Sequence, residues 1–241
     1  MKVSIIVPAF NEEKLIAASL ESTRRSLSAF SDRGWESELV VCDNNSTDRT
    51  AELARAAGAT LVFEPVNQIG RARNCGARAA SGDWFIFVDA DSHPSRELFA
   101  DTADTIQTQK YLFGGCTLKM DANHFVAGMI TGLWNVISRW KTLAAGTYIF
   151  CEAAAFRSIN GFDNHLFASE ELDLCIRLKK LARERGKRGV ILHRHPLVTS
   201  ARKLHLYSSR EHLNFLRKTV FGWGKTLRSR EECHTWYDGR R

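Results

Sequence analysis

Short apolar runs alternate with segments of helical character over residues 1–90. Four runs have the length and composition of β-strands, at residues 3–7, 38–42, 60–63 and 84–88. The segments between them have the caps, spacing or propensity of helices, at residues 11–30, 46–57 and 71–80. Asn11 is expected to cap the first helix, and Ser46 to open the second. This alternation predicts a parallel, doubly wound α/β sheet.

The alternation is less regular after residue 105. Residues 170–184 have the spacing of a helix, and residues 206–223 place leucine, valine and tryptophan at helical spacing with arginine and lysine between them. We therefore expect one domain with two halves and a basic, amphipathic helical C-terminal tail, over residues 1–203 (halves 1–105 and 106–203) and 204–241.

Polar clusters follow three of the expected strands. They lie at residues 8–12, 43–45 and 89–91. In open α/β sheets, ligands bind outside the carboxyl ends of the strands. The three clusters are far apart in sequence, and we expect them to meet at one edge of the sheet.

Two carboxylates, Asp89 and Asp91, stand directly after the apolar run at residues 84–88. Their mutual repulsion and loss of hydration are costly unless a cation joins them. Hard oxygen ligands in a short, open site suit Mg²⁺ or Mn²⁺ shared with substrate phosphates. The D-x-D pattern is common, and it gains weight only from its surroundings.

Charge is distributed unevenly along the chain. The formal net charge is +7, yet residues 176–230 hold sixteen lysine or arginine residues against Glu184 and Glu211. Such a segment favours an anionic partner, and a solvated basic face is the alternative. No nucleic-acid-binding motif accompanies it, so nucleic acid is not an expected partner. Basic and aromatic residues on one amphipathic helix fit an anionic membrane surface, whereas packing of residues 206–223 on the core or on a second subunit, as a homodimer, is the alternative.

The composition is that of a globular protein with a substantial core, at 241 residues with 44% hydrophobic and 25% charged side chains. Six cysteines are scattered without a C-x-x-C pair, which indicates reduced thiols. The first apolar run is too short for a signal peptide, and residues 125–138 fall short of the ~20 residues that span a bilayer. We expect a cytoplasmic protein, peripheral at the inner face of the membrane where its tail binds lipid.

The order of the motifs resembles that of the family 2 glycosyltransferases of GT-A fold. The matching strings lie at residues 7–13, 41–48, 67–76, 82–91, 161–163 and 170–178. The resemblance implies a GT-A type fold, a Rossmann-like, mostly parallel sheet flanked by helices. It also implies that residues 1–105 bind a nucleoside diphosphate sugar, of UDP or GDP type, and that residues 106–203 bind the acceptor.

The resemblance assigns a set of residues to the donor sugar nucleotide: Pro8, Ala9, Phe10, Asn11, Glu12, Asp43, Asn44, Arg71, Asp89, Ala90, Asp91 and Arg202. Asp43 would accept a hydrogen bond from the N–H of a uracil or guanine ring; an Asx-turn is the alternative, and it fits Asn44 better. Arg71 is favoured over Arg73 for a forked contact to the diphosphate, and either could be a structural charge. Arg202 would touch the diphosphate when a loop closes.

The resemblance also implies metal ligands and a general base for proton transfer. Asp91 is expected to ligate the cation, with Asp89 nearer the ribose or bound through water, and His193 is expected to complete the metal shell. His193 could instead pack or meet solvent. Glu171 stands where the family has its general base, usually an aspartate, and Glu170 is the reserve; dipole compensation at a helix start is the alternative for this pair.

The expected reaction is an inverting, single displacement onto a sugar or lipid-linked acceptor. Two other classes compete with it. A nucleotidyltransferase would carry a glycine-rich, basic loop after the first strand, whereas residues 8–13 are acidic and lack glycine. A catalytically inactive nucleotide-sugar binding or membrane-associated scaffold module would not need the carboxylates, all of which are present.

Overall fold

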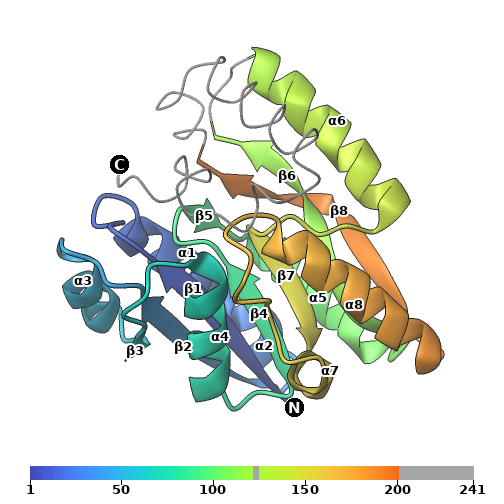
Figure 1. The fold of residues 1–241 in the computed structure, drawn as a ribbon, viewed down its shortest axis with the longest axis horizontal. Coiled ribbons are helices and arrows are strands. Elements are labelled where there is room, and N and C mark those ends of the chain that lie inside the picture. Colours follow the sequence, from blue (N-terminus) through green and yellow to red (C-terminus); the bar gives the residue numbers. More distant parts are fainter. Residues whose placement is uncertain (122–124, 201–241) are drawn as a thin grey trace.

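The computed structural model describes residues 1–121 and 125–200. Its centre is one eight-stranded sheet in the order β3-β2-β1-β4-β7-β6-β8-β5 (Figure 1). The strands are β1 Lys2–Ala9, β2 Glu36–Asp43, β3 Thr60–Phe63, β4 Trp84–Val88, β5 Ser92–His93, β6 Tyr111–Met120, β7 Tyr148–Glu152 and β8 Arg188–Thr199. The helices are α1 Ile16–Ser26, α2 Ser28–Ser31, α3 Thr50–Ala56, α4 Ile69–Ala79, α5 Arg96–Gln107, α6 Phe125–Lys141, α7 Ala153–Ser158 and α8 Glu170–Glu184.

The sheet is mostly parallel, as the sequence predicts, with antiparallel exceptions in its second half. Strands β1, β2, β3 and β4 pair in parallel, and so do β6 and β8. Strand β7 lies antiparallel between β4 and β6, and β5 pairs antiparallel with the end of β8. Helices follow the parallel strands because a crossover is needed to return the chain to the same end of the sheet.

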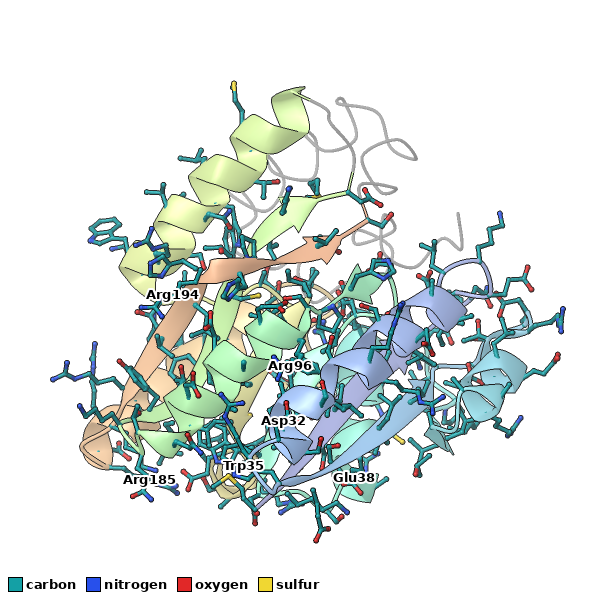
Figure 2. The ribbon with its side chains drawn as sticks, turned by 180° about the vertical axis from the view of Figure 1, so that it is seen from behind. Asp32, Trp35, Glu38, Arg96, Arg185 and Arg194 are labelled. Atoms are coloured by element: carbon teal, nitrogen blue, oxygen red, sulfur yellow. The ribbon has the colours of Figure 1, made fainter. Side chains whose placement is uncertain are left out.

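Two apolar layers pack on the two faces of the sheet. Side chains of β1 alternate between them, since successive residues of a strand point to opposite faces: Val3, Ile5 and Val7 join one core, and Ile6 the other. Helices α1, α2 and α5 cover the first face, behind the sheet in Figure 1, and α4, α7 and α8 cover the second, in front of it. On the first face, Arg96 of α5 donates to Asp32 just after α2 (Figure 2).

The start of the first helix differs from the expectation. Asn11 is not a helix cap: its φ is 52°, in the left-handed region, and α1 begins only at Ile16. Its side chain binds the loop after β2 instead. The first helical stretch is also divided, since α1 ends at Ser26 and α2 begins at Ser28.

Residues 201–241 lie outside the described part of the chain, and with them Arg202 and the predicted tail. Within the described residues, no helix combines the length and the apolarity that crossing a bilayer requires.

Candidate functional site

The carboxyl ends of β1, β2 and β4 meet at one edge of the sheet. Pro8 lies opposite Cys42 and Ala9 opposite Asp43 in the β1–β2 register, while Ile6 lies opposite Phe87 in the β1–β4 register. The residues that follow β4, Asp89 to Asp91, therefore emerge beside the end of β1. The predicted convergence of the three polar clusters is confirmed.

The loops that follow β1 and β2 are joined by hydrogen bonds. The Asn11 backbone N–H donates to the Ser46 hydroxyl at 3.0 Å, and the Asn11 side-chain oxygen accepts from the Thr47 N–H at 2.8 Å. The backbone N–H of Glu12 donates to the Thr50 hydroxyl at 2.8 Å. Asn11 thus joins the loop after β1 to the loop after β2.

Asp43 and Asn44 are both buried at the end of β2. One carboxylate oxygen of Asp43 accepts from the Ser46 N–H at 3.1 Å, the turn contact that the sequence suggested for its neighbours. The Asn44 amide donates to the carbonyls of Glu64 and Val66 and accepts from the Gln68 N–H. The side chain of Asn44 therefore holds the loop before α4, and its contact with the donor stays a prediction.

Ala9 and Ala90 are buried, and their side chains belong to the apolar core on the first face of the sheet. Only their backbone atoms are available to a donor. Pro8 is buried and Phe10 is half-buried at the same edge.

Helix α4 joins the two halves of the domain. The Asn74 amide donates to the Phe162 carbonyl, and its oxygen accepts from the Phe162 N–H, each at 2.9 Å. Gly161 makes this possible, because it has a φ of +64° and a Cβ there would lie 2.4 Å from the Asn74 Oδ1. The segment that leads into α8 is therefore held against α4, at a fixed distance from the ends of β1 and β4.

Arg73 is the central cation of the site. Its side chain is 1% exposed, and its guanidinium donates to Glu170 at 2.6 Å, to Asp89 at 3.0 Å and to the Gly146 carbonyl at 2.8 Å. Gly146 permits this approach, since a Cβ there would lie 2.9 Å from the Arg73 Nη2. The arginine thus links the start of α8 to the first carboxylate after β4.

Arg71, which the sequence favours over Arg73 for the diphosphate, does not line the pocket beside Arg73, and its contact with the donor stays a prediction. Its Nε donates to the Gln68 side chain at 3.0 Å, and it is half-buried in the first turn of α4. Arg73 is two positions further along the helix, on the side that faces the protein. The R-N-x-G string at residues 73–76 includes Arg73, but the helical pattern alone does not show which of the two arginines faces the protein.

The two glutamates at the start of α8 have different environments. Glu170 is buried and paired with Arg73, so it serves as a structural anion. Glu171 is half-buried and lines the pocket. Desolvation and the neighbouring charge of Glu170 raise the pKa of Glu171 from 4.5 to about 8, against the opposing effect of Arg73. A carboxyl with such a pKa can exchange a proton near neutral pH.

A pocket of about 290 Å³ lies between these groups. Its wall includes Arg73 and Asp89 from the donor half, and Glu170, Glu171 and residues 145–147 from the acceptor half. Asp89, Glu170 and Glu171, from distant parts of the sequence, therefore line one cavity, whereas Asp43 and Asp91 are not among its lining residues.

Asp91 is buried, two positions after Asp89 of the pocket wall. Its backbone carbonyl accepts from the Ser200 N–H at 3.3 Å, and the adjacent Ser92 pairs with Thr199 of β8. The end of β8 and Ser200 therefore lie beside Asp91, and Ser200 is two positions before Arg202 in the sequence. Among the described residues, no group of three or more histidine, cysteine, aspartate or glutamate side chains is arranged to hold a metal ion.

His193 lies at an irregular part of β8. It is exposed, and the register with β6 shifts around it, since Leu192 lies opposite Cys116 whereas Leu197 lies opposite Leu118. Its neighbour His195 contacts Asp101 of α5 at 2.9 Å, on the first face of the sheet. The assignment of His193 as a metal ligand stays a prediction.

A family model described as Glycosyl transferase family 2 matches residues 4–160. The chain belongs to this family. Among family 2 proteins it resembles TarS of Staphylococcus aureus, a poly(ribitol-phosphate) beta-N-acetylglucosaminyltransferase, with 34% identity over 110 residues that cover 43% of this chain and 18% of TarS. It also resembles WfaP of Escherichia coli, a UDP-Glc:alpha-D-GlcNAc-diphosphoundecaprenol beta-1,3-glucosyltransferase, with 25% identity over 133 residues, 54% of this chain and 51% of WfaP.

Solved structures show the same fold. The mannosyltransferase PcManGT from Pyrobaculum calidifontis, in complex with GDP-Man and Mn²⁺, superposes with a TM-score of 0.69 at 19% identity, over 94% of this chain and 62% of that one. S. aureus TarS 1–349 in complex with UDP-GlcNAc gives 0.66 at 23% identity, over 98% and 69%. The GT-A type fold expected for family 2 is confirmed. The chain spans about half or less of the curated family 2 relatives named above.

Proposed function

We propose that this chain is a glycosyltransferase that moves a sugar from a nucleoside diphosphate sugar, of UDP or GDP type, to a sugar or lipid-linked acceptor. One observation carries the proposal: the carboxyl of Glu171, with its raised pKa, shares a pocket with Asp89, and Arg73 holds the two sides of that pocket together. An acid–base group thus faces the place where family 2 resemblance puts the donor.

The donor would lie along the edge formed by β1, β2 and β4. Asp43, with one oxygen on the Ser46 N–H, would offer its carboxylate to the ring N–H of uracil or guanine. Pro8, Phe10, Asn11 and Glu12 would wall the base. Arg202 would reach the diphosphate from the segment that follows Ser200, whose N–H is already bound to Asp91. The complexes of relatives with UDP-GlcNAc and GDP-Man support a donor of this class.

The carboxylates fit a divalent cation such as Mg²⁺ or Mn²⁺. Asp91 would hold it, with Asp89 directly or through water, and oxygen ligands of this kind at a strand exit suit an ion that completes its shell with substrate phosphates and water. When bound, the cation neutralises charge on the diphosphate.

Glu171 would act on the acceptor. Its carboxylate takes the proton from the acceptor hydroxyl as that oxygen attacks the anomeric carbon, and the bond from this carbon to the diphosphate breaks in the same step. The configuration inverts because attack and departure occur on opposite sides. Glu170 is bound to Arg73 and is therefore assigned to positioning rather than to proton transfer.

The acceptor is proposed to be lipid-linked, at the inner face of the membrane. Two observations support this choice: the basic residues that begin in α8 and continue beyond it, and the E. coli relative whose name specifies a diphosphoundecaprenol-linked acceptor.

A binding screen tests the proposal. The full chain would be heated with UDP, GDP, CDP and dTDP sugars, each with and without Mn²⁺, and the thermal midpoint recorded. We expect one nucleotide class to raise the midpoint, and Mn²⁺ to increase the effect, because a ligand that binds only the folded state stabilises it. Binding without donor hydrolysis or transfer would favour the inactive binding module. No stabilisation by any sugar nucleotide would contradict the proposal.

A further inference from the structure

Helix α6 turns its polar side toward the protein. Thr131 and Ser138 are buried against the domain. The side-chain amide of Asn135 donates to the Leu118 carbonyl, and its oxygen accepts from the Leu118 N–H, each at 2.9 Å. Asn135 thus attaches the helix to β6 by binding both backbone groups of Leu118. Amphipathic helices of globular domains normally bury their apolar side, so this orientation is reversed.

The outer side of α6 is apolar and exposed. Leu133 is 64% exposed and Trp140 is 76% exposed. The stripe recurs at helical spacing and projects away from the sheet (Figure 2), and its members are Met129, Ile130, Leu133, Val136, Ile137 and Trp140. A contiguous apolar surface of this kind marks an interaction site.

The charges around the stripe identify its partner. Residues 125–141 contain no aspartate or glutamate, and the helix ends with Arg139 and Lys141. The Lys141 ammonium lies 3.8 Å from the centre of the Trp140 ring. Helix α6 also contacts β8, the strand that carries Arg194 (Figure 2). Apolar residues, interfacial tryptophan and positive charge at one end are the properties of a helix that lies in the plane of an anionic membrane.

The stripe is close to the pocket along the chain. The Ser138 hydroxyl donates to the Leu143 carbonyl at 2.6 Å, and the Leu143 N–H donates to the Ser138 carbonyl at 3.0 Å, which closes the turn after α6. The next residues, 145–147, line the pocket. The C-terminal end of α6 is therefore close to the pocket.

We propose that α6 is a membrane-docking helix that lays its outer stripe on anionic phospholipid. The role of this membrane contact rests on the proposed function, because the contact would bring a lipid-borne acceptor to the pocket beside Glu171. At 17 residues, α6 is suited to lying at the interface and falls short of a span. The positive charges select the headgroups, and the apolar stripe enters the boundary of the acyl chains.

Vesicle sedimentation of the full chain tests the proposal, without donor or acceptor. The vesicles are phosphatidylcholine with and without phosphatidylglycerol. We expect the protein to sediment with the anionic vesicles, and Leu133→Gln/Val136→Gln to weaken binding about tenfold or more, since two apolar side chains leave the boundary. The matched control is Ile176→Gln, which replaces an equally exposed apolar residue (61%) on α8 and should bind like wild type.

Removal of the charges gives a second variant that leaves the apolar stripe in place. Arg139→Gln/Lys141→Gln should weaken binding about fivefold for each charge and reduce its dependence on salt. Circular dichroism would show whether the Leu133→Gln/Val136→Gln variant is folded. If that variant folds poorly, Arg139→Gln/Lys141→Gln tests the same contact.

Three results would overturn the proposal. One is a wild-type chain that stays in the supernatant with anionic vesicles at low salt. Another is undiminished binding of both α6 variants, which would assign the contact to residues 201–241. The third is a dimer in sedimentation velocity that Leu133→Gln/Val136→Gln dissociates, which would show that a second copy covers the stripe. Glu171→Gln should bind vesicles normally, so a failure of the catalytic proposal is distinguishable from a failure of this one.

Discussion

Replacement of Arg73 should destabilise the protein strongly, because the arginine neutralises a carboxylate that water cannot reach. In Arg73→Met the side chain of Glu170, 4% exposed, loses a 2.6 Å charged hydrogen bond, and the Gly146 carbonyl loses its donor at 2.8 Å. Removal of one partner of a buried ion pair costs about 3–5 kcal/mol. The free energy of unfolding should fall by that amount, measured by urea denaturation at neutral pH.

A second substitution separates the pair from the packing. In Arg73→Met/Glu170→Leu no buried charge is left without a partner at these positions, and replacement of both members by apolar side chains is often close to neutral. We expect the double variant to recover at least about 2 kcal/mol relative to Arg73→Met.

Arg71→Met is the control on the same helix. It removes one hydrogen bond to the neutral side chain of Gln68 and should cost about 1 kcal/mol or less. A loss below about 1 kcal/mol for Arg73→Met, or no recovery in the double variant, would refute the assignment of Arg73 as the cation that holds the site together.

Three further predictions concern the same machinery. Gly161→Ala should destabilise more than Gly34→Ala. Both glycines have a left-handed φ (+64° and +68°), but only at Gly161 would a Cβ clash, with the Asn74 Oδ1 at 2.4 Å and the Phe156 ring at 2.8 Å. The difference in unfolding free energy measures these clashes, and equal losses would contradict them. Turnover should rise with pH through about 8 as Glu171 loses its proton. The same raised pKa lowers the stability of the folded state progressively above pH 4.5, because the folded protein resists loss of this proton. Glu171→Gln should therefore unfold at a higher temperature than wild type at alkaline pH, and a lower unfolding temperature would count against the raised pKa. Asp91→Asn should weaken both Mn²⁺ binding and Mn²⁺-dependent donor binding in calorimetry, whereas an unchanged metal dependence would remove Asp91 from the cation site.

The sequence predicted the first half of the fold closely. The strands at residues 60–63 and 84–88 have the predicted bounds, as does the helix at 170–184. These elements are short apolar runs, or regular helical patterns, whose local signal agrees with their burial. The antiparallel insertion of β7 between β4 and β6 was not predicted, because pairing order depends on contacts between distant segments.

The chemistry was predicted in part. The meeting of the strand ends follows from parallel topology, so the amino-acid pattern alone is enough to locate the region of Asp43 and Asp89. The choice of Arg73 over Arg71 required the orientation of α4 against the acceptor half. His193 was assigned by its distance in sequence from Glu171, and that distance does not reveal the shift of register between β6 and β8 beside it.

Helix α6 illustrates a different limit. Its periodicity shows one polar and one apolar side, but periodicity does not say which side faces the protein. Asn135 decides the orientation, because its amide binds the backbone of β6. Such a contact can be found only once the partner strand is in place.

The most direct test of the central claim is a comparison of Glu171→Gln with wild type in donor binding and in transfer, with the sugar nucleotide and Mn²⁺ that the screen identifies. The proposed general base predicts nearly unchanged donor affinity and a fall in turnover of about 10²- to 10⁴-fold. A Glu171→Gln protein that transfers sugar at a near-normal rate would contradict the account.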